Sequence, residues 1–364
     1  MRLETLYKTS TKGATQVLNM EIVGAVYTRT WGQLGGKMQA KSTTAKGKNI
    51  GKANETSPEQ QAISEAEAVW VKKQKANYST LQEAPITVKL PMKVNKYQGN
   101  EGKVTLPCFT SNKLNGVNTE YRLVDGELKL LSRGGEEYPI PEHQREDVIE
   151  YLEALGTTSL NGEMYIHGEY LQDIMGATKK TNKLTPKLIF WVFDFPEIEG
   201  DYAARYTKAS AMVGSLGISS VKLIGVGVAI SSSDIEAQHA TAVEGGYEGL
   251  IIRSGVGLYK YNTRSLDVFK YKIAMDAEFK VIGHELDKNK HTVFTCKAGN
   301  ELDSTFKVKC KGTAKERLIM SECAEQYIGK YLKVEYEMLS KDGIPLKPVG
   351  IMFRKVDSKG EATE

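Results

Sequence analysis

Apolar and polar residues alternate along two runs near the start of the chain, 15–23 and 24–31, and this alternation predicts a pair of β-strands. A Gly-rich turn and a lysine-rich loop follow. Ser57 then precedes a proline, and Gln60 can close a capping box with it, so a helix is expected to begin here. We expect the helix to reach residue 75. One side of it would carry Ala62, Ala66, Val69 and Trp70.

Strand-like segments dominate the pattern from residue 104 onward. Two of them, 117–123 and 128–132, flank an Asp-Gly turn, which predicts a hairpin. A helix is expected over 141–155 because its apolar residues have helical spacing and Gly156 can end it. Further strands are predicted at 104–109, 160–168, 188–193, 221–230 and 250–253, and further helices at 202–216 and, after an N-cap at Ser233, up to 243.

The end of the chain, 274–364, has a third pattern. Five strand-like segments occur there, and one helical segment at 314–326 separates the third from the fourth. Five strands with a helix at this place are typical of an OB-fold barrel. The chain is therefore predicted to have three domains, at 1–82, 83–273 and 274–364. A proline-containing linker that begins near residue 78 is expected to join the first domain to the second.

Composition narrows the class of protein. The chain has 364 residues, 40% of them hydrophobic and 26% charged, as in a globular protein. No run is long enough to span a membrane, and the start lacks the apolar core of a signal peptide. A net charge of +4 permits a nucleic-acid partner without requiring one. The four cysteines have no metal-site spacing, so we expect reduced thiols in the cytoplasm and no zinc centre.

Lys113 is the first candidate for chemistry. It stands between an apolar strand and a small Lys-x-x-Gly element ending at Gly116, and burial favours the uncharged, nucleophilic form of a lysine. Taken alone, Lys113 could be one more solvated charge among 49 lysines and arginines. The order of the elements that follow it changes this interpretation.

Six short motifs follow one another with compatible spacing. They are Lys113-Leu114-Asn115-Gly116, Ser132-Arg133, Asn161-Gly162-Glu163, Phe193-Asp194-Phe195, Glu248-Gly249-Leu250-Ile251-Ile252-Arg253 and Lys270-Tyr271-Lys272. Each is weak alone, but the series resembles that of the ATP-dependent DNA ligases, especially the compact phage type. Phe353-Arg354-Lys355-Val356-Asp357 is a loose version of the family's last motif. The resemblance implies an α+β chain, with a nucleotidyltransferase (ATP-grasp-like DNA ligase) domain of antiparallel sheets and helices before the OB-fold barrel.

The resemblance also implies a role for each matching residue. Lys113 would attack the α-phosphorus of ATP and become a lysyl-AMP. Glu163 would bind the ribose and, with Glu248, hold Mg²⁺. Phe193 would stack on adenine, whose edge the backbone at Ser111 and Asn112 would read; Gly116 belongs to the same nucleotide site. The phosphate contacts implied are Lys270 and Lys272 on the α-phosphate and Arg133 on the AMP phosphate or the DNA 5′-phosphate.

Physical chemistry agrees with these roles. Phosphoryl transfer needs positioning and charge neutralisation, which two lysines on one strand face and a divalent ion can supply. Alternatives remain open at several positions. Glu163 could be a turn carboxylate, Phe193 a core residue, and Lys270 and Lys272 solvated charges. Arg253 could be a structural ion pair or a DNA contact.

Two departures from the family pattern bear on activity. The family's first motif usually reads Lys-x-Asp-Gly-x-Arg, whereas this chain has Asn115 in place of the aspartate and Asn118 in place of the arginine. Arg122 lies on the same strand face as Asn118 but about 13 Å further along, at ~3.3 Å per residue, so it is a poor substitute.

The first domain resembles a WGR domain, with Trp31-Gly32-Gln33 where that family has Trp-Gly-Arg. Such domains contact DNA ends or nicks. The missing arginine leaves open whether this domain binds DNA or is only structural. Lysines of its basic loop could contact phosphates without that arginine. The predicted DNA contacts outside the nucleotide site are Lys41, Lys46, Lys48, Arg253 and Arg354.

The resemblance thus implies a monomeric ATP-dependent DNA ligase of DNA repair or replication. Its substrates would be ATP and nicked double-stranded DNA in the cytoplasm of a bacterial or phage-infected cell. An RNA ligase or mRNA-capping-type nucleotidyltransferase is the nearest alternative, because it would share the lysine, the Gly-Glu pair and the paired lysines. A DNA-binding relative with weakened catalysis is the other.

Overall fold

The computed structural model describes residues 1–9, 14–76, 78–80, 89–214, 216–356 and 362–363. The predicted domain boundary at 82/83, and Asp357 of the last motif, lie outside this part of the chain. Two compact units can be distinguished. One consists of Met1–Met92, Thr119–Tyr138 and Lys260–Thr263, and the other of Lys93–Asn118, Pro139–Tyr259 and Arg264–Glu364. Each is considered by itself.

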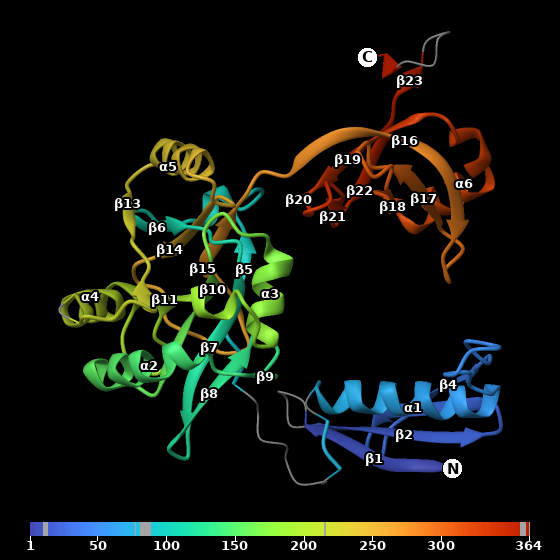
Figure 1. The fold of residues 1–364 in the computed structure, drawn as a ribbon, viewed down its shortest axis with the longest axis horizontal. Helices are drawn as coiled ribbons and strands as arrows, with labels where there is room; N and C mark the ends of the chain where they lie inside the picture. The colour runs from blue at the N-terminus through green and yellow to red at the C-terminus, as the bar shows by residue number, and fades with distance from the viewer. Residues whose placement is uncertain (10–13, 77, 81–88, 215, 357–361, 364) are drawn as a thin grey trace. The chain divides into compact units, whose positions relative to one another are not determined.

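The first unit begins with a four-stranded antiparallel meander covered by a helix (Figure 1). The strands are β1 (Arg2–Thr9), β2 (Thr15–Val23), β3 (Val26–Gln33) and β4 (Met38–Thr44), and the helix is α1 (Pro58–Gln74). The capping box of Ser57 and Gln60 is confirmed. Ala62 and Ala66 of α1 pack on Met20 and Ile22 of β2, as the helical spacing predicts. Strand β1 was not predicted.

The same unit contains the predicted Asp-Gly hairpin. It joins β7 (Val117–Val124) to β8 (Glu127–Ser132), and the short β9 (Glu137–Tyr138) follows. Asp125 and Gly126 have φ angles of 52° and 80°, the left-handed conformation that a two-residue hairpin turn of this type requires.

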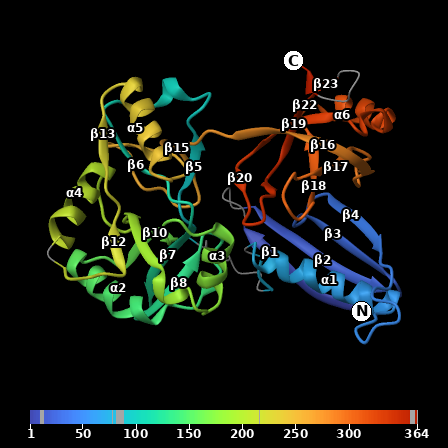
Figure 2. The ribbon, with the colours of Figure 1, turned by 45° about the horizontal axis from the view of Figure 1, so that its top comes forward.

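A five-stranded sheet is the frame of the second unit, with strand order β13-β6-β14-β15-β5. Its strands are β5 (Lys93–Lys96), β6 (Cys108–Asn112), β13 (Gly227–Ala229), β14 (Leu250–Ser254) and β15 (Arg264–Tyr271). Helix α5 (Ser232–Glu244) contacts β13, β6 and β14, and Figure 2 shows it near β13 and β6. The pairings in this sheet are antiparallel, as predicted, except at its edge, where β5 pairs in parallel with β15.

Three further strands of this unit lie side by side in the order β12-β11-β10. They are β10 (Ser159–Tyr165), β11 (Ile189–Asp194) and β12 (Val221–Leu223), and β12 is parallel to β11. The remaining helices here are α2 (Glu142–Leu155), α3 (Leu171–Lys179) and α4 (Tyr202–Val213). The predicted strand at 221–230 is in fact β12 and β13, and the N-cap of α5 is Ser231, not Ser233. Helix α3 and strand β5 were not predicted.

The end of the second unit is a closed five-stranded barrel in the order β16-β17-β18-β22-β19 (Figure 1). Its strands are β16 (Met275–Leu286), β17 (Thr292–Lys297), β18 (Thr305–Cys310), β19 (Tyr331–Tyr336) and β22 (Val349–Phe353). Helix α6 (Ala314–Glu322) lies between the third and fourth barrel strands of the chain. This confirms the predicted barrel. Short strand pairs join β20 (Met338–Leu339) to β21 (Pro345–Leu346) and β23 (Lys355–Val356) to β24 (Ala362–Thr363).

The four cysteines are free, and Cys108, Cys296 and Cys310 are buried. Within the described ranges, the longest apolar helical stretches fall short of what a membrane crossing requires.

Candidate active site

One edge of the five-stranded sheet brings Lys113 next to Glu248. Lys113 directly follows β6, and its N–H donates a hydrogen bond of 2.8 Å to the carbonyl of Gly249. The N–H of Glu248 donates one of 3.0 Å back to the carbonyl of Lys113. Gly249 has a φ of +139°, and a Cβ there would lie 2.1 Å from the carbonyl oxygen of Tyr271. Only glycine fits this place, which explains the Glu-Gly sequence of the motif.

The charges at this edge form a connected series. The Glu248 carboxylate accepts a hydrogen bond from the Lys113 ammonium and another, of 2.7 Å, from Lys272. The three side chains are 14–19% exposed, so water screens their interactions only in part. Burial raises the pKa of Glu248, but Lys113 and Lys272 outweigh it and hold that pKa below its usual value. Burial, then the charges of Lys272 and Lys113, lower the pKa of Lys270.

Glu163 is held beside Gly116, three residues after Lys113, by a close contact between two chain segments. A Cβ at Gly116 would lie 2.2 Å from the carbonyl oxygen of Met164 and 2.8 Å from Cγ of Glu163, so the glycine of the Lys-x-x-Gly element allows this approach. The Glu163 carboxylate accepts hydrogen bonds from the Gly116 N–H and the Asn118 side chain. Burial and the neighbouring Glu248 nevertheless raise the pKa of Glu163 to about 7.

Because the pKa of Glu163 is raised, the free energy of unfolding decreases as pH rises through this range. The Glu163 carboxyl ionises at about 7 when folded, against 4.5 for the unperturbed group, so the folded state binds more protons between these values. Stability is therefore lost as pH rises from about 4.5 to 7. We expect Glu163→Gln, which resembles the protonated form, to raise Tm at pH 8 and to leave it nearly unchanged at pH 4.5. Thermal unfolding of both proteins at the two pH values checks this. Glu153→Gln, at an exposed position of α2, should change Tm little at either pH; an equal rise in both variants would contradict the assignment.

A cavity of about 160 Å³ lies beside Lys113. A buried space of about 150 Å³ accommodates one benzene ring, so this one suits a flat aromatic group. Asn112 and Leu114, the neighbours of Lys113, contribute to its wall. The other lining residues are Tyr165, His167, Ile189, Trp191, Ile224, Gly225 and Tyr247.

Trp191, and not Phe193, is the aromatic residue of β11 that lines this cavity. Trp191 lies opposite Glu163 in the β10–β11 pairing, and Tyr165 lies opposite Ile189. Phe193 lies further along β11, with the Arg253 guanidinium 5.1 Å from its ring centre. Sequence reasoning missed Trp191, although the alternation of β11 places positions 191 and 193 on one face.

Arg253 forms a buried ion pair with Asp194, which is one of the two alternatives that the sequence leaves open for it. Its side chain is 7% exposed, and Nη1 donates to Oδ2 of Asp194 at 3.2 Å. Arg205 donates two hydrogen bonds to the same carboxylate, at 2.9 and 3.2 Å. A guanidinium enclosed in this way is not at a surface that DNA can reach. Of the two alternatives that the sequence left open for Arg253, the ion pair is the one observed.

The other predicted residues lie as follows. Ser111 is buried in β6 opposite Ile251. Arg133 is exposed in the turn between β8 and β9, in the first unit, so its place at the nucleotide site stays a prediction. Lys41 and Lys46 are exposed. Lys48 is 3.3 Å from the Glu65 carboxylate, and Arg354 donates to Glu278 at 2.6 Å, but both keep exposed surface.

The carboxylates of Glu163 and Glu248 could bind a divalent cation, whose remaining ligands would be phosphate oxygens and water. Mg²⁺ prefers oxygen ligands and is usually bound by one or two carboxylates together with phosphates and water. Glu163 and Glu248 supply such oxygens, and their mutual repulsion, which contributes to the raised pKa of Glu163, would be relieved by a cation. In the part of the chain that the structure describes, no cluster of three or more His, Cys, Asp or Glu side chains forms a metal site of its own.

The site therefore consists of a lysine paired with a carboxylate, a second carboxylate and two further lysines at one sheet edge, beside a cavity that suits a flat ring. The model of the family described as RNA ligase matches residues 107–272, which begin just before Lys113 and end at Lys272. Two solved structures share the fold. A structure from a study of Lig E DNA ligases is 19% identical and has a TM-score of 0.59, covering 74% of this chain and all of the other. Pmar-Lig_Pre is 17% identical with a TM-score of 0.66, covering 82% and 74%.

Two relatives of similar sequence are named DNA ligase. The DNA ligase of African swine fever virus (isolate Warthog/Namibia/Wart80/1980) is 27% identical, over 92% of this chain and 85% of the viral protein. The DNA ligase of Enterobacteria phage T4 is 25% identical over 48% of this chain and 38% of the phage protein.

Proposed function

We propose that this protein is an ATP-dependent DNA ligase, which seals nicks between a 5′-phosphate and a 3′-hydroxyl in duplex DNA. The observation that carries the proposal is the position of Lys113, hydrogen-bonded to Glu248 at a sheet edge and adjoining a cavity of suitable size for a base. The sequence similarity to viral and phage DNA ligases supports it.

In the first step, Lys113 releases its proton and attacks the α-phosphorus of ATP as a neutral amine. An N–P bond forms, the P–O bond to the β-phosphate breaks, and pyrophosphate leaves with the electron pair, while the new phosphoramidate loses its surplus proton to water. Lys270 and Lys272 offset the negative charge on the α-phosphate. Mg²⁺ held by Glu163 and Glu248 would supply further positive charge to the phosphate oxygens.

In the next two steps AMP moves to the DNA. The 5′-phosphate oxygen attacks the phosphorus of lysyl-AMP, the P–N bond breaks, and Lys113 leaves as an amine after taking up a proton from water. The 3′-hydroxyl then loses its proton to water and attacks the 5′-phosphorus, and AMP leaves with the electron pair of the broken P–O bond. We assign adenine to the cavity beside Asn112, with Trp191 as its stacking partner; Phe193, the residue that the family resemblance suggests, lies beside Arg253 instead. Stacking of a base on an aromatic side chain contributes roughly 1–3 kcal/mol.

The rest of the chain would bind DNA through its phosphates. The closed barrel has the strand order expected of an OB fold, and the meander with α1 would act as a WGR-like domain. Lys41, Lys46 and Lys48 of this domain, Arg354 of the barrel and Arg133 would contact the backbone, so binding should weaken steeply with salt. A monomer acting in DNA repair or replication, in the cytoplasm of a bacterial or phage-infected cell, completes the proposal.

A nicked-substrate assay tests the proposal against its nearest alternatives. We expect the protein to gain the mass of AMP when incubated with ATP and Mg²⁺, and to seal nicked DNA faster than nicked RNA. A GTP requirement would indicate a capping-type enzyme, and faster sealing of RNA an RNA ligase. Without any mass gain, the reading as a DNA-binding relative, to which Asn115 and Asn118 point, would replace this one.

A further inference from the structure

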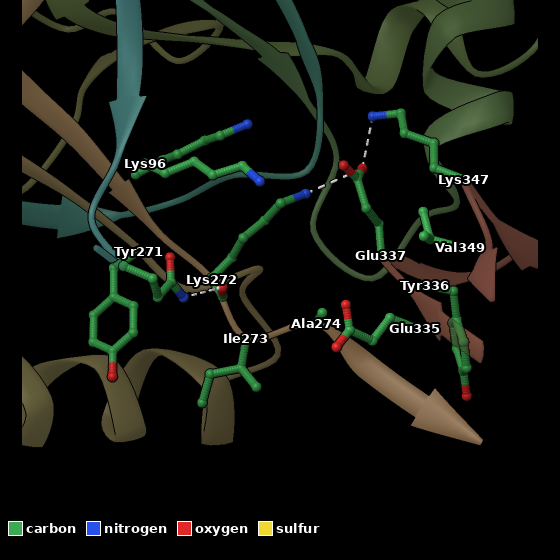
Figure 3. Close-up of a pocket in the computed structure, with 12 residues that line it drawn as sticks. Lys96, Tyr271, Lys272, Ile273, Ala274, Glu335, Tyr336, Glu337, Lys347 and Val349 are labelled. Atoms are coloured by element: carbon green, nitrogen blue, oxygen red, sulfur yellow. Dashed lines mark hydrogen bonds and ion pairs between the residues drawn. The ribbon is translucent and has the colours of Figure 1, made fainter. Parts of the chain in front are cut away.

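A second, larger cavity lies next to Lys272 and has a volume of about 680 Å³. Four lysines line it: Lys96, Lys270, Lys272 and Lys347. Figure 3 shows Lys96 and Lys272 extending into this space, with Lys347 on its other side. None of the motifs in the sequence includes Lys96, which lies 17 positions before Lys113.

Strand order places Lys96 at the far end of the row that begins with the nucleophile. The row crosses the sheet edge from β6 through β14 and β15 to β5, and the register aligns Asn112 with Leu250, Leu250 with Tyr271, and Lys270 with Lys96. Neighbouring strands are about 4.8 Å apart, so β6 and β5 are separated by roughly 14 Å. Lys113 therefore stands at one end, Lys270 and Lys272 in the middle, and Lys96 at the other end.

The order of the lysines along the sheet edge matches the direction of an in-line displacement at the α-phosphorus. The leaving oxygen must depart on the side of the α-phosphorus opposite to the attacking nitrogen. With Lys113 on the β6 side and the α-phosphate over Lys270 and Lys272, the departing diphosphate extends toward β5. Lys96 is the cationic side chain at that end.

Like charges face one another where β5 pairs with β15. Lys96 and Lys270 are direct partners in the parallel ladder, and adjacent like charges on neighbouring strands cost stability. Within the described residues, neither of the two ammonium groups has a carboxylate partner at ion-pair distance. An anion bound between them would relieve the repulsion.

Two lysines of the cavity already bind a negatively charged group, the carboxylate of Glu337. Glu337, which follows β19, accepts hydrogen bonds from Lys272 at 3.0 Å and from Lys347 at 2.7 Å. Lys272 and Lys347 thus converge on one negative group. Glu335 also lines the cavity, but four lysines against two glutamates leave it cationic.

We propose that this cavity is the subsite of the diphosphate leaving group, and that Lys96 is a binding residue for the pyrophosphate released when Lys113 is adenylylated. This assignment rests on the proposed function, because it needs ATP as the substrate of Lys113.

The reverse reaction provides a direct test. The full-length protein is first adenylylated with radiolabelled ATP, and pyrophosphate is then added to regenerate ATP from lysyl-AMP. In Lys96→Met we expect the KM for pyrophosphate to rise roughly tenfold, the effect of losing one charge-assisted contact. The forward kcat/KM for ATP should fall by a similar factor, and Lys96→Arg should recover much of both.

Two controls separate this role from a structural one. Lys93→Met removes the same charge from the same strand, at a position that does not line the cavity, and should leave the KM for pyrophosphate unchanged. Sealing of DNA that already carries AMP involves no pyrophosphate, so Lys96→Met should seal it at the wild-type rate. An unchanged KM for pyrophosphate in Lys96→Met, or an equal loss in sealing, overturns the inference. A wild-type protein that forms no lysyl-AMP overturns the proposed function instead.

Discussion

Replacing Lys113 with methionine is expected to abolish the gain of one AMP in the presence of ATP and Mg²⁺. Methionine has nearly the same length but no amine that could form an N–P bond, and removing a nucleophile typically costs many orders of magnitude in rate. Intact-protein mass spectrometry after incubation with ATP measures the effect. The side chain is 19% exposed and lies beside Glu248, so the loss should come from chemistry and not from unfolding.

A second measurement distinguishes a missing nucleophile from a damaged site. Sealing of a nick that already carries AMP needs no transfer through Lys113, so the methionine variant should retain part of this activity. Lys93→Met, which removes a lysine of β5 outside the site, should gain AMP like the wild type. A mass gain that persists in the Lys113 variant would mean that another residue carries the nucleotide.

Local chemistry explains which elements could be predicted from the sequence. The helix start at Ser57, the turn at Asp125 and Gly126, and the stop at Gly156 each depend on a few neighbouring residues, and all three are confirmed. The barrel could be predicted for a similar reason, since its five strands alternate regularly and its helix interrupts them at one place.

Long-range pairing explains what the sequence did not reveal. The position of β5 in the sheet is determined by its pairing with β15, about 170 positions later in the chain. A strand of four residues is too short to show a clear alternation of apolar and polar residues. Lys96 was therefore not recognised as a neighbour of Lys270. Similarly, Trp191 and Phe193 share one strand face, and only the pairing of β11 with β10 shows which of them lies opposite Glu163.

Burial decided between alternatives that residue types could not separate. Arginine serves equally as a DNA contact and as a partner of a buried carboxylate, so the motif around Arg253 was ambiguous. The structure places Asp194 between Arg205 and Arg253, with the carboxylate fully enclosed. The aspartate of the Phe-Asp-Phe motif therefore holds Arg253 and, through it, strand β14, which begins two residues after Glu248.

The contribution of Asp194 to the fold can be measured as a change in the free energy of unfolding. Asp194→Ala is expected to lower the free energy of unfolding by about 3–5 kcal/mol, the usual cost of removing one partner from a buried ion pair. The substitution leaves Arg205 and Arg253, which are 1% and 7% exposed, without their common carboxylate. It also removes the acceptor of the Phe195 N–H, which donates to Asp194 at 2.8 Å. Urea unfolding followed by circular dichroism measures the difference.

An exposed ion pair of the barrel supplies the matched control. Asp303 pairs with Lys297 at 2.9 Å, but the two side chains are 74% and 46% exposed. Water screens such a pair, so Asp303→Ala should change the free energy of unfolding by less than about 1 kcal/mol. If both variants lost the same small amount, the Asp194 cluster would contribute no more than a surface pair. A large loss in Asp194→Ala alone would show that the two arginines depend on that one carboxylate, and that the strand behind Glu248 is fixed by burial and charge together.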